Sequence, residues 1–271
     1  MDERLQRRVQ RYGWDKAASY YEQYWQQQLA PAQRKLLQLA NCKPGERVVD
    51  IACGTGLLSF PLLKQVGPSG YLLGTDISDK MVEICRTIAE ANEISNAEFE
   101  RMEAEELKID EGVYDVAICS LGLMYVTDGQ QSVNELYRVL KPGGRAAVLV
   151  WGQRDHCGWA DIFPIVDARV TSEVCPLFFR LGTGDVLQHV FKQSGFTNIK
   201  VEKMQTLLHY NSADEAIGAA FIGGPVALAY NRFTEQVKQE AHTEYLTSIE
   251  KYKEESEYNI PGEFVIVTGY K

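Results

Sequence analysis

The chain is 271 residues long, with 45% hydrophobic and 24% charged residues, which is enough to bury a substantial core without disulfides. Its formal net charge of −9 argues against a nucleic-acid partner, because binding to phosphate backbones depends on clustered Lys and Arg. Neither a signal peptide nor the roughly 20 consecutive apolar residues of a membrane span is found, so we expect a cytoplasmic protein.

Two helices are predicted before residue 42. Between residues 14 and 28, large rings and alanines recur at intervals of three or four, a spacing that lines one face of a helix. The rings of this stripe are Trp14, Tyr21 and Trp25, and Tyr20 and Tyr24 form a second row beside it. Pro31 suits the first turn of a second helix, which is expected to run to Ala40.

From Glu46 onward, short apolar runs alternate with helical stretches. The runs expected to be strands are residues 48–52, 71–75, 114–119 and 145–151. Helices are expected at 79–92, behind Ser78 as N-cap, and at 129–140. Alternation of this kind predicts an α/β protein with a doubly wound, mostly parallel sheet that carries helices on both faces.

The order loosens after Trp151. The expected elements are loops and irregular helix at 152–183, a helix at 185–194, a strand at 199–208, a helix-rich stretch at 212–257 and a strand at 263–270. We expect the last strand to join the same sheet, with residues 209–262 as a helical insertion beside its carboxyl edge.

The six cysteines and four histidines show no metal-ligand spacing. No Cys-x-x-Cys pair occurs, and several of the cysteines lie in apolar runs. We therefore expect buried, reduced thiols and no metal site.

Residues 48–56 are expected to form a buried strand that runs into a tight glycine loop. Gly54 and Gly56 can adopt positive φ and let a ligand lie against the backbone at the start of the next helix. About twenty residues later, Asp76 ends the next strand, where a carboxylate can accept hydrogen bonds from both ribose hydroxyls. The two features together predict a nucleoside-type ligand at the carboxyl end of the sheet.

Asp50 distinguishes between the ligands of this type. A carboxylate at the end of the strand repels a diphosphate, whereas the ammonium and sulfonium groups of S-adenosylmethionine are positive. Ser59 also occupies the place of the third glycine of a dinucleotide-binding loop. S-adenosylmethionine therefore fits better than a dinucleotide. The alternatives are a nicotinamide-dependent oxidoreductase and a noncatalytic S-adenosylmethionine-binding module of the same fold.

Five motifs follow one another along the chain. They are the Asp50–Gly56 loop, Gly74–Ser78, Glu103–Glu105, the stretch from Tyr114 to Asp128, and Glu135–Gly144. In this order they resemble the motifs of class I S-adenosylmethionine-dependent methyltransferases, in the branch of the ubiquinone and menaquinone C-methyltransferases. The resemblance covers residues 12–152. It implies a seven-stranded Rossmann-like sheet and methyl transfer to a small-molecule acceptor, with S-adenosylhomocysteine as the other product.

The resemblance also implies which residues bind the cofactor. For the methionine moiety they are Asp50, Ala52, Gly54 and Gly56; for the ribose, Asp76; for the adenine, Ile77, Met81, Glu103 and Ala104; and near the methionine carboxylate or the methyl group, Ser120. Ala52 stands where the family loop usually has its first glycine. Glu135–Gly144 has a scaffolding role, because its proline and glycines stop a helix and reverse the chain into the next strand.

Methyl transfer from a sulfonium is an in-line displacement, so alignment and a partly dry pocket can supply most of the acceleration and a base is optional. Positions after the strand ends are candidates for the acceptor side: Met124, Tyr125, Trp151, His156 and His209. Of these, Tyr125, His156 and His209 are the candidate catalytic residues. The abundance of Tyr, Trp and Phe favours an apolar or aromatic acceptor.

We expect one integrated domain with three parts. Residues 1–41 are a helical lid, in which Tyr20, from the second row of rings, faces the cofactor. Residues 42–152 are the cofactor-binding core. Residues 153–271 complete the sheet and supply the acceptor-binding insertion.

Overall fold

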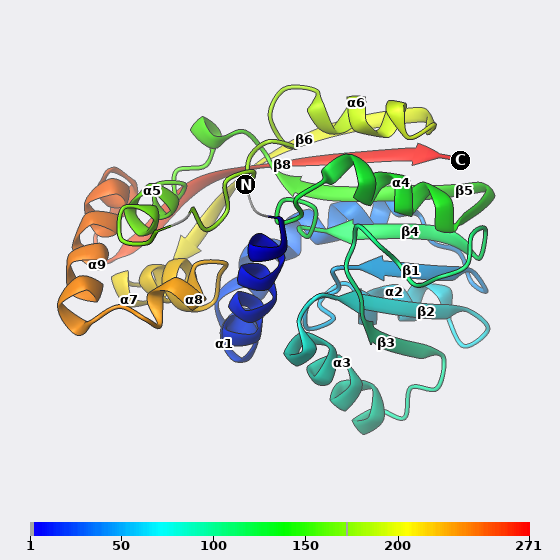
Figure 1. Ribbon diagram of the computed structural model, residues 1–271, viewed down its shortest axis with the longest axis horizontal. Coiled ribbons are helices and arrows are strands. Elements are labelled where there is room, and N and C mark those ends of the chain that lie inside the picture. The colour runs from blue at the N-terminus through cyan, green and yellow to red at the C-terminus, as the bar shows by residue number, and fades with distance from the viewer. Residues whose placement is uncertain (1–2, 172) are drawn as a thin grey trace.

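An eight-stranded sheet runs through the protein in the order β3-β2-β1-β4-β5-β8-β6, with the short β7 paired to β8 (Figure 1). The computed structural model describes residues 3–171 and 173–271. The strands are β1 (Arg47–Ile51), β2 (Tyr71–Asp76), β3 (Ala97–Arg101), β4 (Tyr114–Ser120), β5 (Leu140–Trp151), β6 (Thr197–Tyr210), β7 (Lys253–Glu254) and β8 (Glu257–Tyr270). The first five are parallel, and β8 lies antiparallel between β5 and β6. The predicted fold class is therefore confirmed, including the final strand.

Helices cover the sheet and extend past one end of it. They are α1 (Glu3–Ala40), α2 (Ser59–Val66), α3 (Asp79–Ala91), α4 (Gly129–Val139), α5 (Ile162–Asp167), α6 (Val186–Gln193), α7 (Ala213–Ile217), α8 (Ala227–Tyr230) and α9 (Glu235–Ile249), with the short turns η1 (Arg154–His156), η2 (Gly218–Ile222) and η3 (Glu250–Tyr252). In Figure 1, α5, α7, α8 and α9 gather at one end of the molecule, and α1 lies between this group and α3. Within the described residues, no helix has the length and apolarity to cross a bilayer.

The N-terminal segment is one continuous helix, so the predicted division into two helices is wrong. Pro31 lies inside α1, where it removes one backbone hydrogen bond. The helix continues because its apolar face is buried without interruption on both sides of the proline. Leu29, Ala32, Leu36 and Ala40 all have 0–2% of their surface exposed. Tertiary packing thus compensates for the lost bond.

Local signals located α3 correctly and missed β3. Ser78 caps α3 as predicted, since its hydroxyl accepts a hydrogen bond from the Met81 N–H at 3.1 Å. β3 was not among the expected strands because Phe99 is its one buried residue, and charged neighbours face solvent on both sides of it. All six cysteines are buried and free of disulfides, as predicted.

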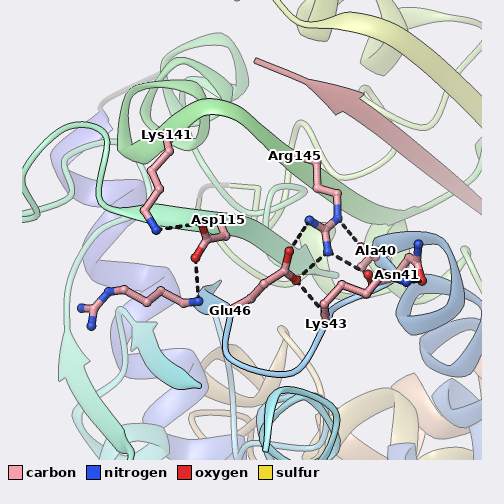
Figure 2. Close-up of polar contacts among 8 residues, drawn as sticks. Ala40, Asn41, Lys43, Glu46, Asp115, Lys141 and Arg145 are labelled. Carbon is pink, nitrogen blue, oxygen red and sulfur yellow. Dashed lines mark hydrogen bonds and ion pairs between the residues drawn. The ribbon is translucent and has the colours of Figure 1, made fainter. Parts of the chain in front are cut away.

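A polar cluster holds together the strand ends remote from the glycine loop (Figure 2). The Lys141 ammonium donates to Asp115 at 2.7 Å, and this carboxylate also accepts from the backbone N–H of Arg47 at 2.8 Å. The Arg145 guanidinium donates to Glu46 and to the carbonyls of Ala40 and Asn41, at 2.6–2.8 Å. The cluster ties the end of α1 to β1 and β5. Lys141 belongs to the Glu135–Gly144 motif, whose position here fits its predicted scaffolding role.

Candidate active site

The carboxyl ends of β1, β2, β3 and β4 meet at one edge of the sheet, where the residues that follow them line a cavity of about 750 Å³ that is partly open to solvent. The predicted cofactor-binding residues that line it are Ala52, Gly54, Asp76, Ile77, Met81, Glu103, Ala104 and Ser120. These residues come from four separate loops, which the parallel sheet brings together. Their contact with a cofactor stays a prediction.

Asp76 is the best-supported carboxylate of this cavity. It is 7% exposed, and its two oxygens accept hydrogen bonds from the backbone N–H groups of Gly54 and Ser78, both at 2.9 Å. Burial raises its pKa to about 6, against the effect of these backbone hydrogen bonds. An ionised carboxylate has about four lone-pair sites. Asp76 therefore keeps acceptor capacity for the two hydroxyls of a ribose.

Asp50 lies beneath the loop and does not line the cavity. Its side chain is fully buried, and its Oδ2 accepts a hydrogen bond from the Ser59 hydroxyl at 2.6 Å, while Oδ1 has no partner among the described residues. Burial raises the pKa of Asp50 to about 7. Asp50 is therefore not part of the cavity wall, and its contact with the methionine moiety stays a prediction.

Gly56 is also outside the lining of the cavity, although its backbone conformation is the one predicted. Its φ is +89°, and an added Cβ would lie 2.5 Å from a ring atom of Phe60. Gly56 is therefore required by the turn and by packing. A role in holding the methionine moiety is not visible at this position.

Two residues of the cavity have strained backbones. Ala52 has a φ of +56° and Leu121 a φ of +62°, in the left-handed region that favours glycine. The two loops that carry them are in close contact, since a Cβ on Gly122 would lie only 2.3 Å from the Cβ of Ala52. Gly122 thus makes room for the alanine that replaces the usual loop glycine. Strain of this kind is concentrated at functional sites.

Buried polar atoms at the cavity lack partners within the protein. The Ser120 hydroxyl and the Gln10 amide oxygen are both buried, and neither has a hydrogen-bond partner among the described residues. Both residues line the cavity. Because buried polar groups are nearly always hydrogen-bonded, a polar ligand fits this space.

Helix α1 supplies one wall of the cavity, with Arg7, Gln10, Trp14 and Tyr21. The Arg7 guanidinium donates to Glu105 at 2.9 Å and lies 3.5 Å from Glu103, which draws α1 toward the loop after β3. Sequence analysis missed Arg7 and Gln10. Their spacing from Trp14 continues the same helical face toward the N-terminus, and this was the available signal.

Tyr20, predicted to face the cofactor, does not line the cavity. Its side chain is 46% exposed, whereas the neighbouring Tyr21 lies in the wall. Adjacent residues of a helix point about 100° apart, so Tyr20 is turned toward solvent, whereas Tyr24 of the same row packs against Gly218 and Gly223. The stripe that docks on the domain is also the one that faces the cavity.

A second cavity, of about 370 Å³, adjoins the first and is lined mainly by rings. Trp14, Tyr21, Leu121 and Tyr125 line both cavities. The rings found in the second cavity alone are Trp25, Trp151, Trp159 and Phe178. We call this second space the aromatic cavity. Tyr125 and Trp151, two of the candidates for the acceptor side, are therefore in place there.

The two candidate histidines lie elsewhere. His156 Nδ1 is 2.9 Å from a carboxylate oxygen of Glu263, and His209 Nδ1 is 3.0 Å from the side-chain oxygen of Asn259. Neither histidine lines either cavity. The chain after β5 turns back onto β8, and β8 separates β6 from β5, so both histidines are carried away from the loops after β1 and β4. Both histidines therefore lie outside these two cavities, and no contact among the described residues supports their predicted catalytic role.

Curated relatives cover the first part of the chain. The demethylmenaquinone methyltransferase of Listeria welshimeri is 32% identical over 130 residues, which are 48% of this chain and 55% of that protein. The ubiquinone/menaquinone biosynthesis C-methyltransferase UbiE of Ectopseudomonas mendocina is 37% identical over 117 residues, 43% of this chain and 46% of that protein. The chain thus spans about half the length of these relatives.

Solved structures share the fold over nearly the whole chain. The YcgJ protein of Bacillus subtilis has a TM-score of 0.62 at 15% identity and covers 89% of this chain and 98% of its own. The phosphoethanolamine N-methyltransferase 2 of Haemonchus contortus, in complex with S-adenosyl-L-methionine, has a TM-score of 0.63 at 15% identity, with 95% of this chain and 57% of its own covered. At these identities the likeness shows the fold alone.

A model of the ubiE/COQ5 methyltransferase family matches residues 25–167, more than half of the chain. This range contains the glycine loop, Asp76, the Glu103–Glu105 motif and the carboxyl end of β4. The chain therefore belongs to the ubiE/COQ5 methyltransferase family, as the order of its motifs predicted.

Proposed function

We propose that this protein transfers a methyl group from S-adenosylmethionine to a small-molecule acceptor in the aromatic cavity. One observation carries the proposal: the cavity lined by the predicted cofactor-binding residues adjoins the aromatic cavity, and Trp14, Tyr21, Leu121 and Tyr125 are shared between them. Family membership supports the cofactor. Nothing in the comparisons supports a nicotinamide-dependent oxidoreductase or a noncatalytic module. The names of the curated relatives favour a quinone-type acceptor.

The protein would accelerate methyl transfer mainly by positioning the cofactor and the acceptor and by excluding water. S-adenosylmethionine supplies a methyl group on a positive sulfur; the new bond forms to a lone pair of the acceptor while the carbon–sulfur pair returns to sulfur. Asp76 would hold the ribose, and the Ser120 hydroxyl would bind a polar group near the reacting end. Rings at the junction exclude water, which strengthens alignment and electrostatic effects.

Tyr125 is better suited to donate a hydrogen bond than to act as a base. Burial raises the pKa values of Tyr125 and Tyr21 well above the ordinary range, so both hydroxyls stay protonated at neutral pH. No Asp, Glu, His or Lys is among the residues that line the aromatic cavity. A proton lost by the acceptor would therefore pass to solvent rather than to a base of this chain.

Cofactor identity is tested by calorimetry of the purified protein. We expect S-adenosylhomocysteine to bind far more tightly than NAD or NADP, because a carboxylate at Asp50, beneath the glycine loop, disfavours a diphosphate there. A reversed preference would contradict the proposed function. Incubation with labelled cofactor and a metabolite extract, followed by mass spectrometry, then identifies the molecule that gains the methyl group.

Residues 1–41 are further proposed to act as a lid over both cavities, in agreement with the wall that α1 contributes. Replacing Arg7 by Gln removes the attachment of α1 to Glu103 and Glu105. We expect S-adenosylhomocysteine affinity to fall about two- to fivefold, in line with a partly exposed ion pair. Hydrogen exchange in residues 12–28 should slow when this ligand binds.

The exposed Arg8 offers a matched control, because Arg8→Gln makes the same change of charge one position away from the wall. Two results together would rule the lid out: hydrogen exchange in residues 12–28 that is identical with and without S-adenosylhomocysteine, and equal affinity of the Arg7 and Arg8 variants for this ligand.

A further inference from the structure

Two buried indole N–H groups of the aromatic cavity have no partner. Trp25, from α1, is 9% exposed, and Trp159, between η1 and α5, is 6% exposed. Both indoles line the aromatic cavity, and neither indole nitrogen has a hydrogen-bond partner among the described residues. A buried donor without an acceptor is costly, so two of them at one cavity indicate a ligand that supplies the acceptors.

Packing holds both indoles in place. The ring of Trp151 lies edge-on to both indoles, and its centroid is 6.3 Å from that of Trp25 and 4.9 Å from that of Trp159. The centroids of Trp25 and Trp159 are 6.4 Å apart. Edge-to-face contacts of this kind favour one arrangement of the rings. The two indoles are therefore held in fixed positions, which favours a defined orientation of a ligand that they bind.

The wall of the aromatic cavity carries no formal charge. Its lining is aromatic, aliphatic, glycine and proline, and its two tyrosine hydroxyls stay protonated at neutral pH. An ionic ligand would lose its hydration there without gaining a counter-ion. A neutral ligand with an oxygen atom instead gains hydrogen bonds from donors that are already dry.

We propose that Trp25 and Trp159 select the methyl acceptor by donating indole N–H hydrogen bonds to an oxygen atom of an uncharged, largely apolar molecule. This inference rests on the proposed function. The two residues act as specificity determinants, since they fix one end of the acceptor while its reacting atom faces the junction at Tyr125. The same wall offers no counter-ion to a charged acceptor such as a carboxylate.

Three bicyclic probes of nearly equal shape test this selection. They are 1-tetralone, which has a carbonyl oxygen, tetralin, which lacks it, and 1-aminotetralin, which is cationic at neutral pH. Binding of each to the full-length protein is measured by calorimetry with saturating S-adenosylhomocysteine. We expect 1-tetralone to bind about tenfold more tightly than tetralin, in keeping with one or two hydrogen bonds, and 1-aminotetralin to bind most weakly.

Substitutions that keep an aromatic ring and remove the N–H test the donors. The double variant Trp25→Phe, Trp159→Phe should lose the preference for 1-tetralone over tetralin and keep its affinity for S-adenosylhomocysteine within about twofold. Tyr230→Phe is the matched control, because it removes a polar group from a ring that contacts His242 outside the aromatic cavity. This control should keep the full preference.

The outcomes separate this inference from the proposed function. Failure of the wild-type protein to bind S-adenosylhomocysteine would contradict the proposed function itself. Where that ligand binds, three results would overturn the indole donors alone: no binding of 1-tetralone, equal binding of the ketone and the amine, or an unchanged ketone preference in the double variant.

Discussion

Replacing Asp76 by Ala is expected to weaken S-adenosylhomocysteine binding by roughly ten- to a hundredfold, the cost of losing an acceptor of two ribose hydrogen bonds. Asp76 ends β2, is buried, and lies in the wall of the larger cavity. It also accepts hydrogen bonds from Gly54 and Ser78, so its removal is expected to loosen two loops at the cavity. Titration calorimetry at constant pH measures the change.

Folding of the Asp76 variant is checked separately, by thermal unfolding without ligand. Asp110→Ala serves as the matched control, since Asp110 is exposed and does not line the cavity. The control should bind as the wild type does. If Asp76→Ala kept its full affinity while remaining folded, the ribose would have to lie elsewhere.

Asp50→Asn is expected to stabilise the ligand-free protein at pH 8 by several kcal/mol. Burial raises the pKa of Asp50 from 3.8 to about 7, so the folded protein favours the neutral carboxyl. This contribution to the free energy of unfolding is fully present below about pH 4 and is lost as the pH rises through 7. A shift of about three pKa units corresponds to roughly 4 kcal/mol.

Urea unfolding of the wild type and of Asp50→Asn between pH 4 and 8 measures this difference. An amide cannot ionise, and it can still accept the hydrogen bond from Ser59, so the variant should lack the loss of stability between pH 4 and 7. Ion-paired carboxyls with lowered pKa values, such as Glu105, act in the opposite direction but are the same in both proteins. Parallel curves for the two proteins would show that the pKa of Asp50 is the same in the folded and unfolded states.

Elements whose signals are local could be predicted from the amino-acid sequence. The strand, glycine loop and helix from Val48 onward, the Ser78 cap and the position of Asp76 at the end of β2 all depend on neighbouring residues, and the structure reproduces them. The order of these motifs along the chain was enough to predict the family. A parallel sheet then brings the strand ends to one edge, so most of the predicted cofactor residues share one cavity.

Features that depend on packing between distant residues could not be predicted in this way. Helix α1 continues past Pro31 because its buried face continues on both sides of the proline. Tyr21, and not Tyr20, lines the cavity. Asp50 is buried beneath the loop, and His156 contacts Glu263 and lines neither cavity. Trp25 and Trp159, which are far apart in the chain, lie with their ring centroids 6.4 Å apart. Local propensity does not predict which side chains meet across the core. Burial of apolar surface brings these side chains together, and this burial depends on the whole fold.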